Sequence, residues 1–139
     1  MTKRYLVLAS FVALLFLTVG WVYAQQTPAG FAGNKVTHLL TVDLSGVANK
    51  QAIANIYEVP AGAMVPRHFH HGDEFHLVLS GEWAAEVQDK PPHVMKAGDA
   101  QFVERERWHG GKALGDKPLR LLGVMIVDKD KPILEVVKP

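Results

Sequence analysis

The 139-residue sequence contains no cysteine. This absence excludes disulfide bonds and lipid attachment at a cleavage-site cysteine, so stability has to come from a hydrophobic core and from any bound metal. A charge excess is missing as well. Lys3 and Arg4 account for two of the 15 basic residues, which leaves 13 against 14 acidic residues in the rest of the chain. This near-neutral balance argues against a nucleic-acid surface or a polybasic membrane patch.

The N-terminus has the three parts of a secretory signal peptide. Lys3 and Arg4 precede an apolar stretch over residues 6–19, and Ala24 supplies a small residue for cleavage. Only one arginine precedes the apolar stretch, so the sequence has no twin-arginine signal. We therefore predict a signal peptide at residues 1–24 and a periplasmic or secreted protein. The alternative is an uncleaved membrane anchor, because residues 5–24 are about long enough to cross a bilayer.

The remaining chain is predicted to form one domain. Residues 25–34 are polar with glycine and proline, which is typical of a flexible leader. Residues 35–139 are enough for a single hydrophobic core but not for two. No internal repeat, coiled coil or low-complexity segment interrupts them.

No segment after residue 24 shows a helical hydrophobic period of useful length. Instead, short runs rich in β-branched and aromatic residues alternate with turn residues such as Ser80-Gly81 and Ala97-Gly98-Asp99. The expected strands are residues 36–44, 51–59, 74–79, 83–88, 93–96, 100–103, 119–128 and 133–137. Many short strands at this spacing predict an all-β sandwich or barrel.

The spacing of three residues in the middle of the chain predicts a metal site. His68 and His70 are two apart, so on a strand both imidazoles face the same side. Glu74 follows a short turn and opens the next strand, which places its carboxylate opposite the histidine pair. His109, after a further hairpin, is the fourth candidate ligand.

Three imidazoles and one carboxylate suit a single divalent transition metal: zinc, manganese, iron, nickel or copper. They also leave one or two coordination positions open, as a catalytic metal requires. The ligands do not identify the metal. Loading outside the cytoplasm gives weight to zinc or copper, which bind nitrogen and oxygen sites more tightly than manganese or iron.

The segment from Gly62 to Gly81, with His68, His70 and Glu74 between them, resembles the first sequence motif of the cupin family. Lys96-Ala97-Gly98-Asp99 followed by His109 resembles the second. The resemblance implies an all-β fold, a single cupin barrel (a double-stranded β-helix, jelly-roll-like), with the metal inside on those four residues. The second motif departs from the family, because Glu104 and Glu106 replace the usual proline and glycine.

Several other residues have two interpretations. His76 lies two residues beyond Glu74 and should share its inward face, as a base, proton shuttle or extra ligand, or as a polar residue lining the pocket. We take Glu74 and His76 as the candidate catalytic residues. His71 should point away from the ligands as an ordinary exposed histidine, and His38 is expected to be structural or on the surface. Three aromatic residues are candidates for cavity walls or for plain core packing: Trp83, Phe102 and Trp108.

These observations support two functions. The first is a metal-dependent enzyme acting on a small organic substrate, for which the resemblance suggests dioxygenase, oxidase or decarboxylase chemistry. The alternative is a non-catalytic periplasmic module that binds a metal or a small molecule, favoured by the absence of a second domain. A barrel that uses the histidines only for stability is a third reading. The resemblance also implies a homodimer.

Overall fold

The computed structural model describes residues 31–138. The expected signal peptide at 1–24 and residues 25–30 of the expected leader lie outside this range. Within it the chain forms strands joined by turns, and no helix there is long and apolar enough to span a membrane. The strands are β1 (Lys35–Asp43), β2 (Lys50–Val59), β3 (Met64–Phe69), β4 (Gly72–Ser80), β5 (Glu82–Val87), β6 (His93–Lys96), β7 (Ala100–Val103), β8 (His109–Leu114), β9 (Leu119–Asp128) and β10 (Glu135–Val136).

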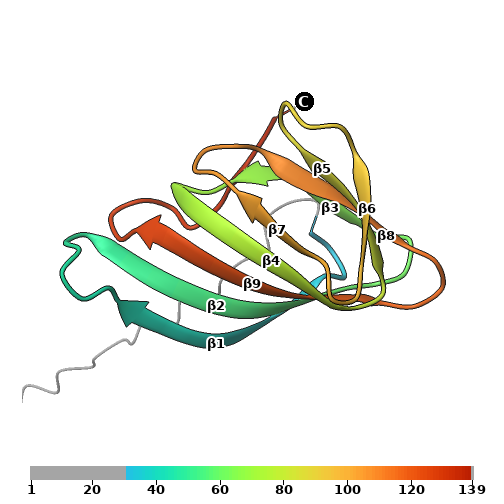
Figure 1. Cartoon of the computed structure of the whole chain (residues 1–139), viewed down its shortest axis with the longest axis horizontal. Coiled ribbons are helices and arrows are strands. Elements are labelled where there is room, and N and C mark those ends of the chain that lie inside the picture. Colours follow the sequence, from blue (N-terminus) through green and yellow to red (C-terminus); the bar gives the residue numbers. More distant parts are fainter. Residues whose placement is uncertain (1–30, 139) are drawn as a thin grey trace, which may run out of the picture.

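The strands make two antiparallel five-stranded sheets. One has the order β1-β2-β9-β4-β7, and the other has the order β10-β3-β8-β5-β6. Figure 1 shows the longer strands of the first sheet running beneath the shorter strands of the second. Strands that follow each other in the sequence often belong to different sheets, as β3 and β4 do. The expected all-β single barrel is confirmed.

Side-chain alternation along the strands produces the interior. On β4, Glu74, His76 and Val78 are buried, whereas Phe75 and Leu79 on the alternate face are exposed. Two buried apolar clusters fill the barrel. The larger contains Val59, Val78, Trp83, Ala85, Met95, Ala113, Leu119 and Leu121. The smaller contains Ile53, Met125 and Val127.

Two strands were not among the expected runs, and both carry metal-site residues. β3 contains Pro66, which cannot donate to a ladder, and its pairing with β8 shifts register between Val65 and His68. β8 begins His109-Gly110-Gly111, with no apolar alternation. Pairing with β3 and β5 defines β8, so local sequence could not predict it.

Two glycines expected to make turns do so. Gly62 and Gly81 have φ angles of 74° and 81°, in the left-handed region that glycine adopts without strain. A Cβ atom on Gly81 would lie 2.7 Å from the carbonyl oxygen of Pro118. Glycine is therefore required at residue 81 both for its left-handed conformation and because the chain entering β9 passes close to it.

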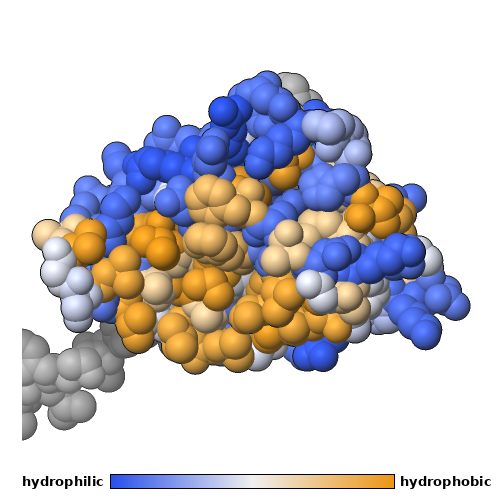
Figure 2. All heavy atoms as spheres, viewed as in Figure 1, coloured by the Kyte–Doolittle hydropathy of each residue, from blue (hydrophilic) through white to orange (hydrophobic). Residues whose placement is uncertain are grey.

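The outer face of the first sheet is apolar. Phe75 and Phe102 stack there with ring centroids 4.8 Å apart, and they are 47% and 41% exposed. A groove of about 440 Å³ runs along this face beside Leu122 and Val124. Figure 2 shows hydrophobic side chains gathered over this sheet, with hydrophilic residues concentrated elsewhere in the view.

Candidate metal centre

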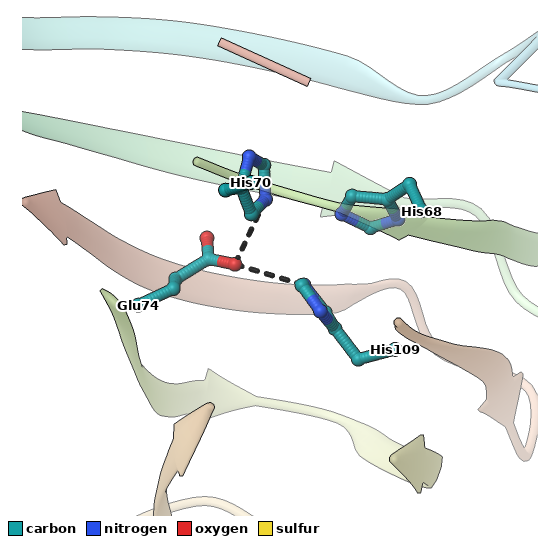
Figure 3. A group of neighbouring side chains, drawn as sticks. All are labelled: His68, His70, Glu74 and His109. Carbon is teal, nitrogen blue, oxygen red and sulfur yellow. Dashed lines mark ion pairs between the residues drawn. The ribbon is translucent and has the colours of Figure 1, made fainter. Parts of the chain in front are cut away.

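Three strands bring the four expected ligands together. His68 is on β3, His70 follows its end, Glu74 is on β4, and His109 is the first residue of β8. His68 and His109 are direct cross-strand partners in the second sheet, while Glu74 comes from the first sheet. The site therefore forms where the two sheets face each other. Figure 3 shows the four side chains converging on one point.

The four side chains are almost completely shielded from solvent. His68 is 6% exposed, His70 4%, and Glu74 and His109 1% each. One ligand atom from each residue lies within 4.8 Å of those of the other three. Burying four ionisable groups so close together is costly unless they share a proton or a cation. The predicted group of four is thus present as one cluster that can hold a single metal ion.

Backbone carbonyls orient the three imidazoles. Nδ1 of His68 donates to the carbonyl oxygen of Pro66 at 2.8 Å, and Nδ1 of His109 donates to that of Arg107 at 3.2 Å. Nδ1 of His70 donates to the carbonyl oxygen of Ile133. Because a carbonyl only accepts, each Nδ1 carries a proton, and the lone pair of the neutral ring is on Nε2. Metal-binding histidines typically donate a hydrogen bond in this way from the ring nitrogen that does not bind the metal.

The Nε2 atoms of His70 and His109 face the Glu74 carboxylate. Glu74 Oε2 lies 2.9 Å from His109 Nε2 and 3.1 Å from His70 Nε2. All three atoms are buried, and none has a partner with hydrogen-bond geometry. Ligands about 2.0–2.2 Å from a metal lie roughly 3 Å from their neighbours. These orphaned lone pairs therefore fit a transition metal bound through Nε2 and Oε2.

Electrostatics favour a neutral His68 and an ionised Glu74, as a metal needs, but they favour a proton on His70. Burial, reinforced by His109 and His70, lowers the pKa of His68 to about 3. Burial would raise the pKa of Glu74, but His76 and His70 hold it well below its usual range. Burial also opposes protonation of His70, yet the charge of Glu74 outweighs it and raises the pKa of His70. At neutral pH the centre contains an ionised carboxylate and a neutral His68.

His76 shares the inward face with Glu74, as its position on the strand predicted. Its Nε2 lies 3.2 Å from Glu74 Oε1, the oxygen that does not face His70 and His109. The Gln101 amide donates to His76 Nδ1 at 3.3 Å, so the proton of the neutral ring is on Nε2, the nitrogen nearest Glu74. The His76 ring also packs edge-on against Trp83, with centroids 5.2 Å apart. His76 thus lies beside the Glu74 carboxylate, and its role in catalysis stays a prediction.

The charged run at residues 104–107, just before His109, makes hydrogen bonds to the segments that carry the metal ligands. The Arg105 backbone N–H donates to Asp73, and its guanidinium donates to the carbonyl oxygen of His71 and, at 2.6 Å, to Asp128. The Glu106 backbone N–H donates to the carbonyl oxygen of His70. These contacts join the run to segments that are distant in the sequence.

Glu106 in this run has an unusual backbone conformation, and His71, which it contacts, departs from expectation. Glu106, where the family usually has glycine, adopts a left-handed φ of 61°. His71 is not an ordinary exposed histidine, because its side chain is only 17% exposed and lies between Glu106 and Glu135. Both residues thus belong to the structure that supports the ligand loop.

A cavity of about 820 Å³ opens onto the metal centre. Its wall includes the four expected ligands, His76 and Trp83, and apolar residues such as Ile53, Leu121 and Met125. Of the three aromatic candidates, Trp83 lines the cavity. Phe102 instead lies on the outer face of the first sheet, and Trp108 stacks beneath the Arg67 guanidinium at 4.4 Å.

The polar residues of the cavity wall that were not predicted as site residues include His38, Asn55 and Tyr57. The alternation of Ile53, Asn55, Tyr57 and Val59 on one face of β2 was the signal that could have found the last two. His38 was expected to be structural or on the surface. It faces the cavity because it pairs with Asn55 across β1 and β2.

Comparison with known proteins identifies the family. The family model described as "Cupin domain" matches residues 55–126, just over half of the chain, including all four expected metal ligands. No curated protein matches the sequence at a significant level.

Solved structures share the fold at low sequence identity. The DMSP lyase DddQ from Ruegeria pomeroyi DSS-3 has a TM-score of 0.63 and 22% identity over 76% of this chain, which spans only 52% of the lyase chain. A cupin-like protein from Thermotoga maritima has a TM-score of 0.58 and 24% identity over 75% of both chains. The polyketide cyclase RemF from Streptomyces resistomycificus has a TM-score of 0.56 and 24% identity, covering 75% of this chain and 72% of its own.

Proposed function

Because the chain belongs to the cupin domain family, we propose that it is an exported metalloenzyme that acts on a small organic molecule. It uses one divalent transition metal held by His68, His70, Glu74 and His109. The observation that carries this proposal is the set of orphaned Nε2 and Oε2 atoms at the wall of a large cavity. A purely structural metal site is closed, whereas a catalytic one keeps a position open to its substrate.

The chain's own residues have distinct roles in this proposal. When bound, the metal would supply Lewis-acid polarisation of a substrate oxygen. The carbonyl-bound histidines keep their Nε2 lone pairs directed at the centre. His76 Nε2 lies beside Glu74 Oε1, where it is placed to take a proton from the substrate or to give one to it. The apolar wall around Ile53 and Leu121 excludes water from the reacting groups.

The reaction class rests on family resemblance, which suggests dioxygenase, oxidase or decarboxylase chemistry. The structural neighbours include proteins named as a lyase and a cyclase, which supports small-molecule chemistry on this fold without assigning a reaction. At these identities the likeness concerns the fold alone. The single domain also fits the alternative, a non-catalytic periplasmic module that binds a metal or a small molecule.

Turnover measurements distinguish the two functions. Residues 25–139, loaded in turn with each of the five candidate metals, are assayed for oxygen uptake and product formation with phenolic, enol and dicarboxylate substrates. We expect turnover with at least one metal, lost in the His68→Ala/His70→Ala variant and kept in His93→Ala, which changes an exposed histidine on β6. Saturable small-molecule binding without turnover would instead establish the binding module.

Export is a separate proposal, based on the signal-peptide pattern of residues 1–24. Its test is fractionation of cells that express the full chain, followed by mass spectrometry of the mature N-terminus. We expect a periplasmic or secreted protein that begins at Gln25. A membrane-bound protein that retains residues 1–24 would establish the uncleaved anchor.

We also propose that two copies pair through the outer face of the first sheet. The exposed Phe75–Phe102 pair lies on this apolar face, and large apolar patches on soluble proteins mark interfaces. A two-fold axis would place the same face of each copy against the other. Light scattering should give a dimer for the wild type and a monomer for Phe75→Glu, and a monomeric wild type would contradict the proposal.

A further inference from the structure

The cavity has a second polar group besides the metal ligands. His38 on β1 and Asn55 and Tyr57 on β2 all face inward, because His38 pairs with Asn55 and alternate β2 residues share one face. The cavity wall around them includes the apolar residues Ile53 and Met125. Polar groups placed singly in an apolar cavity are the ones that orient a ligand.

The hydrogen bonds of this group run in one direction. Asn55 Nδ2 donates to the Tyr57 hydroxyl oxygen at 3.2 Å, and His38 Nδ1 donates to Asn55 Oδ1 at 3.1 Å. The Thr41 hydroxyl then donates to His38 Nε2 at 3.4 Å. Each step is fixed because an amide nitrogen only donates and an amide oxygen only accepts. This series of hydrogen bonds from Thr41 to Tyr57 therefore ends at the phenolic oxygen, and the phenolic proton takes no part in it.

Among residues 31–138, the Tyr57 hydroxyl proton has only a poor acceptor. It is donated to Met125 Sδ at 4.0 Å, and a thioether sulfur is a weak acceptor. Burial and the charge of Glu74 both raise the pKa of Tyr57, so the hydroxyl keeps its proton at neutral pH. Tyr57 thus presents a permanent donor to the cavity.

Tyr57 and the metal ligand Glu74 lie against the same glycine. A Cβ atom on Gly123 of β9 would be 2.4 Å from Tyr57 Cε2 and 3.2 Å from Glu74 Oε1. Gly123 has no left-handed φ, so space rather than conformation makes glycine necessary there. The missing side chain leaves room for both residues beside the centre. A ligand at the metal is therefore close to the Tyr57 ring.

We propose that Tyr57 positions the substrate by donating its hydroxyl proton to an oxygen of a small, mostly apolar ligand bound at the metal centre. This inference rests on the proposed metalloenzyme function and narrows its substrate class. The ligand carries a carbonyl, enolate or phenolate oxygen on an apolar body.

Charge in the cavity separates this class from dicarboxylates. Among the residues that line the cavity, Lys35 is the only lysine or arginine. The Lys35 side chain is 68% exposed, and its Nζ atom lies 3.6 Å from a carboxylate oxygen of Glu58. Its charge is therefore paired with Glu58. A carboxylate of the ligand that does not itself bind the metal would have no second cation to pair with inside the cavity, which makes its burial costly.

The test is ligand binding to the cobalt(II)-loaded protein, followed by its visible absorption spectrum. The probes are tropolone, a singly charged enolone on an apolar ring, and succinate, whose second carboxylate is too far from the first for both to bind the metal as a compact chelate. We expect the wild type to bind tropolone more tightly than succinate. Tyr57→Phe should keep full cobalt content and weaken tropolone binding about tenfold, as expected for the loss of one hydrogen bond to a charged oxygen.

Two further variants separate positioning from general damage. Met125→Leu conserves the volume of the same wall and should change tropolone affinity less than threefold or so. Asn55→Ala removes the group that orients the Tyr57 hydroxyl, so it should weaken tropolone binding in the wild-type background and have no further effect in the Tyr57→Phe background.

Each contrary outcome has its own meaning. Unchanged tropolone affinity in Tyr57→Phe, or tighter binding of succinate by the wild type, would overturn the role of Tyr57 or the substrate class respectively. Loss of cobalt from Tyr57→Phe would overturn positioning in favour of support for the metal centre. A wild-type protein that binds no cobalt would overturn the proposed metalloenzyme itself, and the role of Tyr57 with it.

Discussion

Replacing Gly123 by alanine tests whether Tyr57 and Glu74 occupy neighbouring positions at the metal centre. The backbone of Gly123 suits any residue, so alanine should by itself add about 0.4–1 kcal/mol of stability by restricting the unfolded chain. Its Cβ atom, however, would lie 2.4 Å from Tyr57 Cε2 and 3.2 Å from Glu74 Oε1. Relieving such overpacking costs about 1–3 kcal/mol. The contact therefore outweighs the entropic gain.

We expect Gly123→Ala to lower the free energy of unfolding by about 1–2 kcal/mol. For a domain of this size the midpoint temperature then falls by about 5–15 °C. Zinc affinity should fall as well, because Glu74 has to move. Urea unfolding with zinc and with chelator, together with zinc titration, measures both effects. Val124→Ala on the opposite face of β9 controls for a change in strand propensity.

A double variant locates the cause. Tyr57→Leu removes the ring atom that the new methyl group meets, so Gly123→Ala should cost less in that background by about 1 kcal/mol. Additive effects of the two changes would contradict the reasoning. A Gly123→Ala protein with wild-type stability and zinc affinity would refute it directly.

Three further predictions concern the surroundings of the centre. His76→Leu removes the imidazole beside Glu74 Oε1 and should weaken zinc binding about 10–100-fold by titration, since residues that support metal ligands have effects of that size; an unchanged affinity would remove His76 from this role. Glu106→Gly relieves a left-handed φ and should raise the free energy of unfolding by about 0.5 kcal/mol in urea, whereas a loss above about 1 kcal/mol would show that the glutamate side chain stabilises the loop. Hydrogen bonds from Arg105 and Lys50 lower the pKa of Asp128 to about 2, so its contribution to stability is present above about pH 4 and is lost as the pH falls towards 2. Asp128→Asn should flatten the pH dependence of the urea midpoint in that window, and an unaltered slope would contradict the assignment.

The metal ligands were predictable from sequence because their geometry is local. His68 on β3 and His70 just past its end are two residues apart, and Glu74 follows after the turn, so strand periodicity continued by one residue aligns them. His109 needed the second family motif. β8, which it opens, contains two consecutive glycines and is defined by its pairing with β3 and β5.

The polar chain on the other cavity wall was not predictable in the same way. Simple alternation would place His38, Leu40 and Val42 on one face of β1. The structure has a bulge between His38 and Leu40, so His38 points into the cavity while Leu40 and Val42, the partners of Ala54 and Ala52, lie on the other face. A one-residue change of phase reverses every side chain that follows it, and no local signal marked this one.

The measurement that tests the account most directly is the metal stoichiometry of residues 25–139 purified from the periplasm. It is compared with the His68→Ala/His70→Ala and His109→Ala variants, with exposed His93→Ala as the control. We predict about one transition-metal ion per chain in the wild type and the control, none in the double variant, and a reduced content in His109→Ala. A wild-type protein that contains no metal even after reconstitution, or a double variant that retains it, would contradict the assignment of this cluster as the metal centre.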